Sequence, residues 1–120
     1  MKIHEYQAKQ ILAQSGIRIP KGSVAATPAE ARQAAEGLGG KCVIKAQVHA
    51  GGRGKAGGIK VAANPQEAES LAAQMLGKRL VTHQTTSEGV LISKVLVEEA
   101  VEVQKELYLG LTIDGKAGVP

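Results

Sequence analysis

The sequence predicts an α/β domain in which helices cover the faces of a sheet. Three observations lead to this prediction: two helix starts carry the same capping pattern, short β-rich runs alternate with the helices, and the apolar residues are almost all aliphatic. Strands that alternate with helices of this length are typical of a covered sheet. A chain of 120 residues is also long enough to enclose a core of Ala, Val, Ile and Leu.

The first predicted element is an amphipathic helix over residues 4–16, "HEYQAKQILAQSG". Ala8, Ile11 and Leu12 recur at helical spacing, and Gly16 stands where a glycine commonly follows the last turn. The next residues, "IRIP", are expected to run extended to Pro20.

Two further helices are predicted over residues 27–40 and 64–77. The first begins with Thr27 as N-cap and the second with Asn64. Each cap is followed by proline at the first helical position and by glutamate at the third, which is a capping box combined with the proline preference of a helix start.

Strands are predicted from runs rich in β-branched and aliphatic residues. These runs cover residues 22–26, 41–46, 58–63, 79–84, 89–100 and 105–114. Asp114-Gly115 is a strong hairpin signal. Only five residues follow it, so we expect the chain to stop inside a second, incomplete unit.

Composition and charge narrow the function classes. The formal net charge is +4, with local enrichment of basic residues at positions 41–60 and at Lys78-Arg79, which suits phosphate ligands. The single cysteine, Cys42, excludes an internal disulfide and is interpreted as a small buried apolar residue. The first residues lack the apolar core of a signal peptide. We expect a cytoplasmic protein without a membrane partner.

The segment "KAQVHAGGRGKAGG", residues 45–58, combines glycine with positive charge. Residues 52–57 match the pattern G-x-G-x-x-G, but a dinucleotide site needs a helix after it, and the following "GIKVAA" alternates as a strand. A Walker A loop is excluded because Lys55 is followed by Ala56. We predict a β-hairpin flap whose backbone N–H groups fold over a triphosphate, with Lys45 directed at the same phosphates. The alternative is a solvated hairpin turn with scattered basic residues.

Several of these motifs, in this order, resemble the β subunits of succinyl-CoA synthetases, which are nucleotide-dependent acid–CoA ligases of the ATP-grasp superfamily. The similar stretches are "HEYQAKQIL", "KAQVHAGGRGKAGGIKV", "LGKRLVTHQT", "VLVEEA" and "KELYLG". The resemblance implies an ATP-grasp-type nucleotide-binding lobe with a mixed sheet and flanking helices. It further implies that residues 1–20 form a helix of an adjoining lobe, that 21–100 form the N-terminal lobe, and that 101–120 begin a second, truncated lobe.

The resemblance also implies a set of nucleotide-binding residues. Lys45 matches the phosphate-binding lysine of that family, and the flap that follows falls on Gly52, Arg53 and Gly54. The adenine and ribose region is expected near Glu98, Val101 and Glu106. No catalytic residue is assigned. No metal ligand is assigned either, because His4, His49 and His83 show no metal-ligand spacing.

The implied reaction joins succinate to CoA while ATP or GTP is cleaved, with a partner α subunit that carries the phosphoryl-accepting histidine and the CoA site. Magnesium ligands are expected beyond residue 120, so the chain alone is expected to be inactive. ATP against GTP, and succinate against a relative such as malate, are left open. A rival of another class is a basic nucleic-acid-binding module. The scarcity of aromatic residues argues against it, because single-strand binders usually stack bases on such residues.

Overall fold

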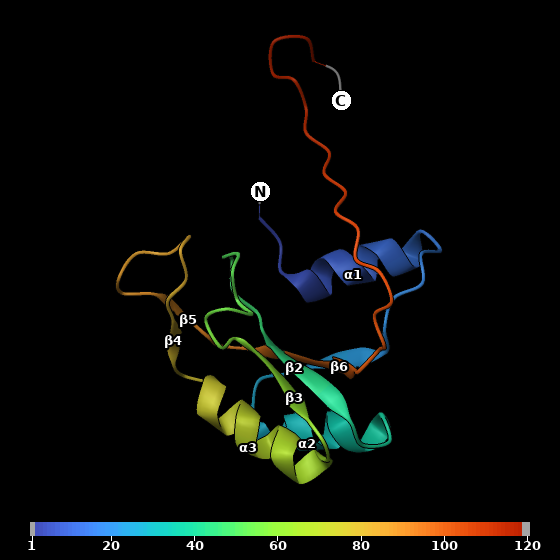
Figure 1. Ribbon diagram of the computed structural model, residues 1–120, viewed down its shortest axis with the longest axis vertical. Helices are drawn as coiled ribbons and strands as arrows, with labels where there is room; N and C mark the ends of the chain where they lie inside the picture. Colours follow the sequence, from blue (N-terminus) through green and yellow to red (C-terminus); the bar gives the residue numbers. More distant parts are fainter. Residues whose placement is uncertain (1, 119–120) are drawn as a thin grey trace.

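The computed structural model describes residues 2–118 and contains a four-stranded sheet with helices on both of its faces (Figure 1). The sheet order is β1 (Gly22–Ala25), β6 (Val95–Glu99), β2 (Cys42–Ala46) and β3 (Ile59–Ala62). Helices α2 (Pro28–Gly37) and α3 (Pro65–Met75) lie side by side on one face, and α1 (Glu5–Gln14) lies on the other. A separate two-stranded ladder joins β4 (Arg79–Leu80) and β5 (Val90–Leu91). The predicted combination of helices and sheet is confirmed.

The core lies between the sheet and the pair α2 and α3. Both helices turn alanines to the sheet, which lets their backbones approach it closely. The largest fully buried side chains are Ile44, Val95, Val97 and Cys42 from the two central strands. Burial also raises the pKa of the Cys42 thiol, with a further contribution from the charge of Glu67, and this agrees with the expected inert, buried cysteine.

The predicted helix caps are present, with one difference in detail. The Thr27 hydroxyl accepts a hydrogen bond from the N–H of Glu30 at 3.2 Å, and the Asn64 side chain accepts one from the N–H of Glu67 at 2.8 Å. Each glutamate carboxylate reaches back one residue further than in a standard capping box, to the N–H of the residue before the cap. Gly16 follows α1 with φ of +80°, as a glycine after the last turn requires.

We expect Thr27→Ala and Asn64→Ala each to lower the free energy of unfolding by about 1 kcal/mol, because each leaves a first-turn N–H without its acceptor. Urea denaturation of the variants measures the loss. Ser70→Ala, at an exposed position within α3, is the matched control and should cost less. Equal losses for the cap variants and the control would show that the caps do not stabilise the helices.

The predicted mixed sheet is wrong, because all three neighbouring pairs of strands are antiparallel. Strands β1 and β2, joined through α2, run in the same direction, but β6 lies between them and runs against both. A strand from a distant part of the chain therefore replaces a parallel neighbour, and nothing local in the sequence reveals that insertion.

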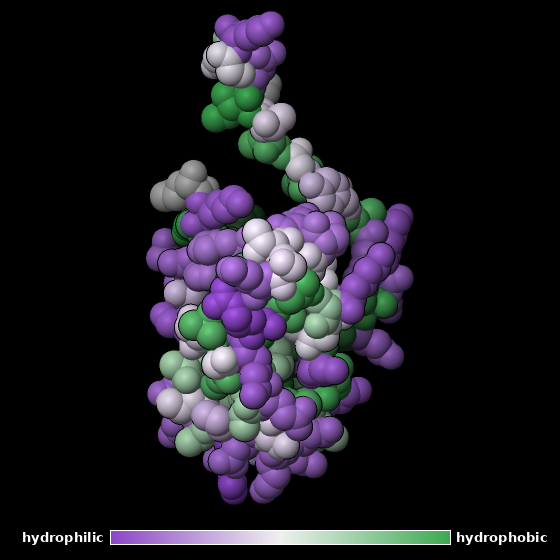
Figure 2. Space-filling view, turned by 90° about the vertical axis from the view of Figure 1, so that its left-hand side faces the viewer, coloured by the Kyte–Doolittle hydropathy of each residue, from purple (hydrophilic) through white to green (hydrophobic). Residues whose placement is uncertain are grey.

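Three predicted strands also differ from the structure. The run 79–84 is a strand only over β4, because Thr82 and Thr85 then close a turn through their hydroxyl and backbone groups. The run 89–100 is divided into β5 and β6 by residues 92–94. Residues 105–114 form no strand among the described residues, and the segment projects from the body with its apolar side chains exposed (Figure 2).

Candidate functional site

Five charged side chains meet between α1, the sheet and the glycine-rich loop. The Glu5 carboxylate contacts the Lys9 ammonium at 3.1 Å, the Lys45 ammonium at 3.2 Å and the Arg53 guanidinium at 2.6 Å. Glu98 pairs with both Lys9 and Lys45. We call these five residues the charge cluster. Three cations and two carboxylates leave it with one excess positive charge.

The alternation of side chains along the strands brings Lys45 and Glu98 together. In the pairing of β2 with β6, Lys45 lies opposite Leu96 and Val43 lies opposite Glu98, so the two charged residues are diagonal neighbours on one face. Ile44 and Val97 point to the other face and into the core. The charged face is the one that α1 covers.

Helix α1 adds the two members of the charge cluster that have no counterpart in the predicted site. Glu5 and Lys9 are one helical turn apart and point to the same side of α1. The backbone N–H of Tyr6 also donates to the side-chain oxygen of Gln47 at 3.1 Å, which fixes the start of α1 next to the end of β2. None of the α1 side chains is fully buried, so polar contacts dominate this attachment.

Glu98 is the most deeply buried member of the charge cluster, with 3% of its surface exposed. Gly22 on β1 lies directly opposite it, and a Cβ atom at position 22 would come within 2.6 Å of the Glu98 Cβ. A glycine is therefore required there for the Glu98 side chain to keep its place. Its two ammonium partners compensate the cost of burying this carboxylate.

The charges of the cluster shift the pKa values of Glu5 and Lys45. Burial raises the pKa of the Glu5 carboxyl, but hydrogen bonds from Arg53 and Lys9 and the charge of Lys45 outweigh burial and lower the pKa to about 2. Burial acts to lower the pKa of Lys45, and the hydrogen bond to Glu98 with the charge of Glu5 outweighs it and raises that pKa. Both shifts keep Glu5 and Lys45 ionised at neutral pH.

The glycine-rich loop connects two paired antiparallel strands, as the sequence predicts. β2 and β3 pair up to Lys45 and Ile59, and the Ala46 N–H donates to the Gly58 carbonyl at 2.8 Å. The loop closes on itself through the Gly58 N–H, which donates to the Arg53 carbonyl at 2.7 Å.

Two residues of this loop, Gly51 and Arg53, tie it to the rest of the protein. The Arg53 guanidinium donates to the Ala46 carbonyl at 2.7 Å in addition to its pair with Glu5. The Gly51 N–H donates to the Gln84 side chain at 2.6 Å. The four backbone N–H groups of residues 52–55 donate no hydrogen bond within the described part of the chain. Free N–H groups beside a guanidinium are suited to an anionic ligand.

A pocket of about 740 Å³ opens at the glycine-rich loop. Glu5 and Arg53 line it from the charge cluster, and residues 48–52 and Lys55 line it from the loop, together with His83 and Gln84 from the turn after β4. This volume falls within the range of small-molecule sites. Lys45 does not belong to the lining and lies behind Glu5 and Arg53 in the chain of ion pairs.

All three histidines gather around this loop. The rings of His4 and His49 stack at 3.9 Å between centroids with 15° between their planes. His83 packs against Gly52, where φ is +77° and where a Cβ atom would come within 2.6 Å of the His83 ring. Burial and then the nearby charges of His49, Lys94 and Arg53 lower the pKa of His4. The residues that the structure describes contain no cluster of three or more metal-ligating side chains.

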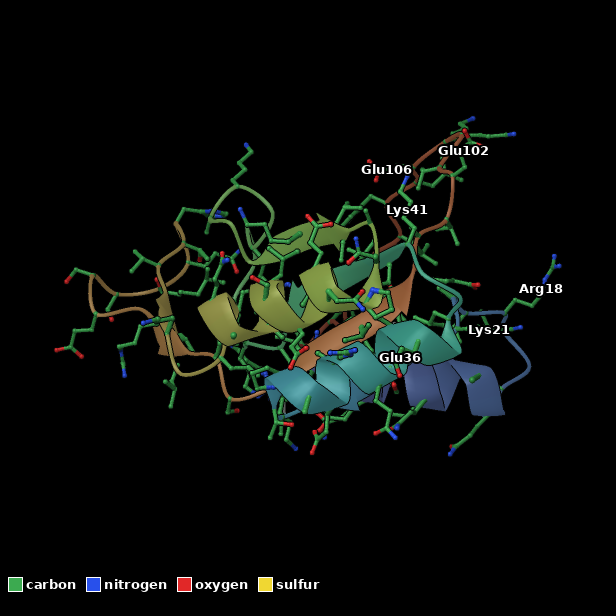
Figure 3. All side chains as sticks on the ribbon, turned by 90° about the horizontal axis from the view of Figure 1, so that it is seen from below. Arg18, Lys21, Glu36, Lys41, Glu102 and Glu106 are labelled. Atoms are coloured by element: carbon green, nitrogen blue, oxygen red, sulfur yellow. The ribbon has the colours of Figure 1, made fainter. Side chains whose placement is uncertain are left out.

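The predicted site residues fall into two groups. Lys45, Arg53 and Glu98 belong to the charge cluster, and Gly52 and Gly54 lie in the adjacent loop. The other two residues, Val101 and Glu106, lie on the exposed segment that follows β6. Figure 3 labels Glu102 and Glu106 of this segment. The structure does not bring Val101 and Glu106 to the charge cluster, and their role stays a prediction.

Sequence reasoning missed Glu5, Lys9 and Gln84. The spacing of Glu5 and Lys9 shows that they share a helical face, which is a usable signal, but it does not show which surface that face meets. Gln84 lies in a stretch that was predicted as a strand, so no contact with the loop was expected.

Comparison with known proteins assigns the chain to a family. Residues 2–120 match the family model described as an ATP-grasp domain. The chain belongs to the ATP-grasp domain family. Curated relatives of this ATP-grasp chain include proteins named succinate–CoA ligase [ADP-forming] subunit beta. Those of Wolinella succinogenes and Solibacter usitatus are each 56% identical over the whole chain, and that of Geobacillus thermodenitrificans is 55% identical over 95% of it.

The ATP-grasp chain spans about 31% of the length of the first two relatives and 30% of the third. The resemblance read from the sequence motifs is confirmed by these matches. Among residues 2–118, none of the helices has the length and apolarity needed to cross a bilayer.

Proposed function

We propose that the chain is the nucleotide-binding part of the β subunit of an acid–CoA ligase that converts succinate, CoA and ATP or GTP into succinyl-CoA, nucleoside diphosphate and phosphate. The names of relatives at about 56% identity support the reaction. The observation that supports the nucleotide role is the pocket lined by residues 52–55, where Arg53 stands among four backbone N–H groups without a partner in the described part of the chain and next to the positively charged cluster. A dicarboxylate such as malate is the alternative acid.

The residues present fit a nucleoside polyphosphate. Lys45 and Arg53 supply charge-assisted hydrogen bonds to phosphate oxygens, and the loop amides of Gly52 and Gly54 supply further donors. Glu98, Val101 and Glu106 would hold the adenine and ribose, where a carboxylate accepts from hydroxyl or amino groups and position 101 offers its backbone. These assignments follow the family motif positions.

The chain's own contribution to the chemistry is positioning and charge neutralisation. The transferred phosphoryl group carries negative charge that spreads over its oxygens, so cations held in fixed places lower the barrier. The antiparallel pairing of β2 and β6 holds the backbone of Lys45 in place, and the hydrogen bond to the Ala46 carbonyl holds the Arg53 guanidinium.

Other components would complete the reaction. Magnesium, when bound, would offset phosphate charge, and we place its ligands outside the described residues. An α subunit would supply the phosphoryl-accepting histidine and the CoA site. The buried free thiol of Cys42 suits a reducing compartment, and we place the protein in the cytoplasm.

The test is Lys45→Ala in the full-length β subunit assembled with its α subunit. We expect nucleotide binding to weaken by about 1.5 to 3 kcal/mol, or roughly 10- to 150-fold, because a charge-assisted contact to phosphate is lost. Calorimetric titration with ATP and ADP, in the presence of magnesium, measures the change.

Lys41→Ala is the matched control. Lys41 is an exposed lysine directly before the first residue of β2, whereas Lys45 lies near the last residue of that strand (Figure 3). It should bind ATP as the parent does. Parent-like affinity of the Lys45 variant, with a parent-like unfolding midpoint, would refute the phosphate role of Lys45. Absence of ATP binding by the parent would refute the proposed function itself.

A further inference from the structure

Among the residues that the structure describes, Glu5 is the one carboxylate that contacts both cations assigned to phosphate. Its two oxygens are divided between them: Oε1 contacts the Lys45 ammonium at 3.2 Å, and Oε2 contacts the Arg53 guanidinium at 2.6 Å. Within the described residues Arg53 has no other carboxylate partner. Glu5 belongs to α1, so a residue outside the sheet and the loop contacts both cations.

Glu5 and Lys45 differ in their position relative to the pocket. Glu5 lines the pocket, whereas Lys45 does not. An anion that enters beside the glycine-rich loop therefore meets Arg53 and Glu5 at the pocket, and it takes the place of the Glu5 carboxylate on Lys45 and Arg53 when these ion pairs open. The side chains of Glu5, Lys45 and Arg53 are each 20–21% exposed, so an anion from solvent has access to this group of charges.

We propose that Glu5 is an internal counter-anion, which holds Lys45 and Arg53 while no ligand is bound and is displaced by the polyphosphate of an incoming nucleotide. This inference rests on the proposed function. Displacement exchanges one carboxylate charge for the charges of the ligand, so a triphosphate gains from the exchange and a singly charged anion gains nothing. Glu5 thereby sets a free-energy cost that a polyphosphate overcomes and that a small anion such as acetate or chloride does not.

The test compares Glu5→Gln with the parent in the full-length subunit, and inorganic tripolyphosphate and inorganic phosphate are the probes. The amide keeps the shape of the side chain but not its charge, so we expect tripolyphosphate to bind about tenfold more tightly to the variant. Inorganic phosphate should gain by a similar factor, because displacing the Glu5 carboxylate costs the same for either ligand. Glu36→Gln is the matched control, an ion-paired glutamate on α2 and outside the pocket lining.

A second measurement uses the parent alone, in case the variant folds poorly. Hydrogen exchange with saturating tripolyphosphate should slow at residues 51–58 and become faster in α1, because binding releases the helix from two of the contacts that hold it. If Glu5 only ordered the site, ligand binding would slow hydrogen exchange both at residues 51–58 and in α1.

Unchanged or weaker binding of tripolyphosphate by Glu5→Gln, with parental binding intact, overturns the role of Glu5 and leaves the proposed function standing. Slower exchange in α1 of the liganded parent overturns it as well. A parent and a variant that both fail to bind tripolyphosphate and ATP overturn the proposed function together with this inference.

Discussion

Glu98→Gln should lower the free energy of unfolding by about 3 kcal/mol, because it leaves two ammonium groups without the buried carboxylate that pairs with them. Glu98 is only 3% exposed and contacts both Lys9 and Lys45. The glutamine has nearly the same volume, so the loss reports charge rather than packing. Chemical denaturation followed by circular dichroism measures it.

Glu99→Gln is the matched control for this substitution. Glu99 is the next residue of β6, is more exposed, and its carboxylate accepts a hydrogen bond from the Lys21 backbone N–H at 2.9 Å that an amide oxygen can also accept. We expect a loss below about 1 kcal/mol. If both variants lose the same free energy, the pairing of Glu98 with the two lysines does not stabilise the fold.

Acid should destabilise the protein through Glu5. The pKa of its carboxyl is about 2 in the folded chain, against an ordinary value of 4.5. Because the folded pKa is the lower one, the stabilisation is complete above pH 4.5 and disappears as the pH falls to about 2. The difference corresponds to at most about 3 kcal/mol.

The measurement is the difference in unfolding free energy between the parent and Glu5→Gln at several pH values. That difference removes the contributions of the other carboxylates, which titrate in both proteins. It should be largest near pH 6 and should shrink steadily between pH 4.5 and 2. A difference that stays constant down to pH 2 would mean that the ion pairs of Glu5 contribute nothing to stability.

The sequence by itself determined the local elements and the family. Thr27 and Asn64 mark the starts of α2 and α3 because a cap needs only residues within four positions along the chain. The glycine-rich loop between two strands is likewise local, since alternation on each side predicts both strands. The order of five long motifs was sufficient to identify the ATP-grasp relationship, and it placed Lys45 and Arg53 in the predicted site.

Only the tertiary structure decided which elements meet. The insertion of β6 between β1 and β2 depends on pairing between residues that are 49 to 76 positions apart, for which no local signal exists. That insertion brings Glu98 beside Lys45. The docking of α1 adds Glu5 and Lys9, whose helical spacing is visible in the sequence although their partners are not. The free energy of these contacts comes from burial and from charge at short range, and both quantities are defined only once the chain has folded.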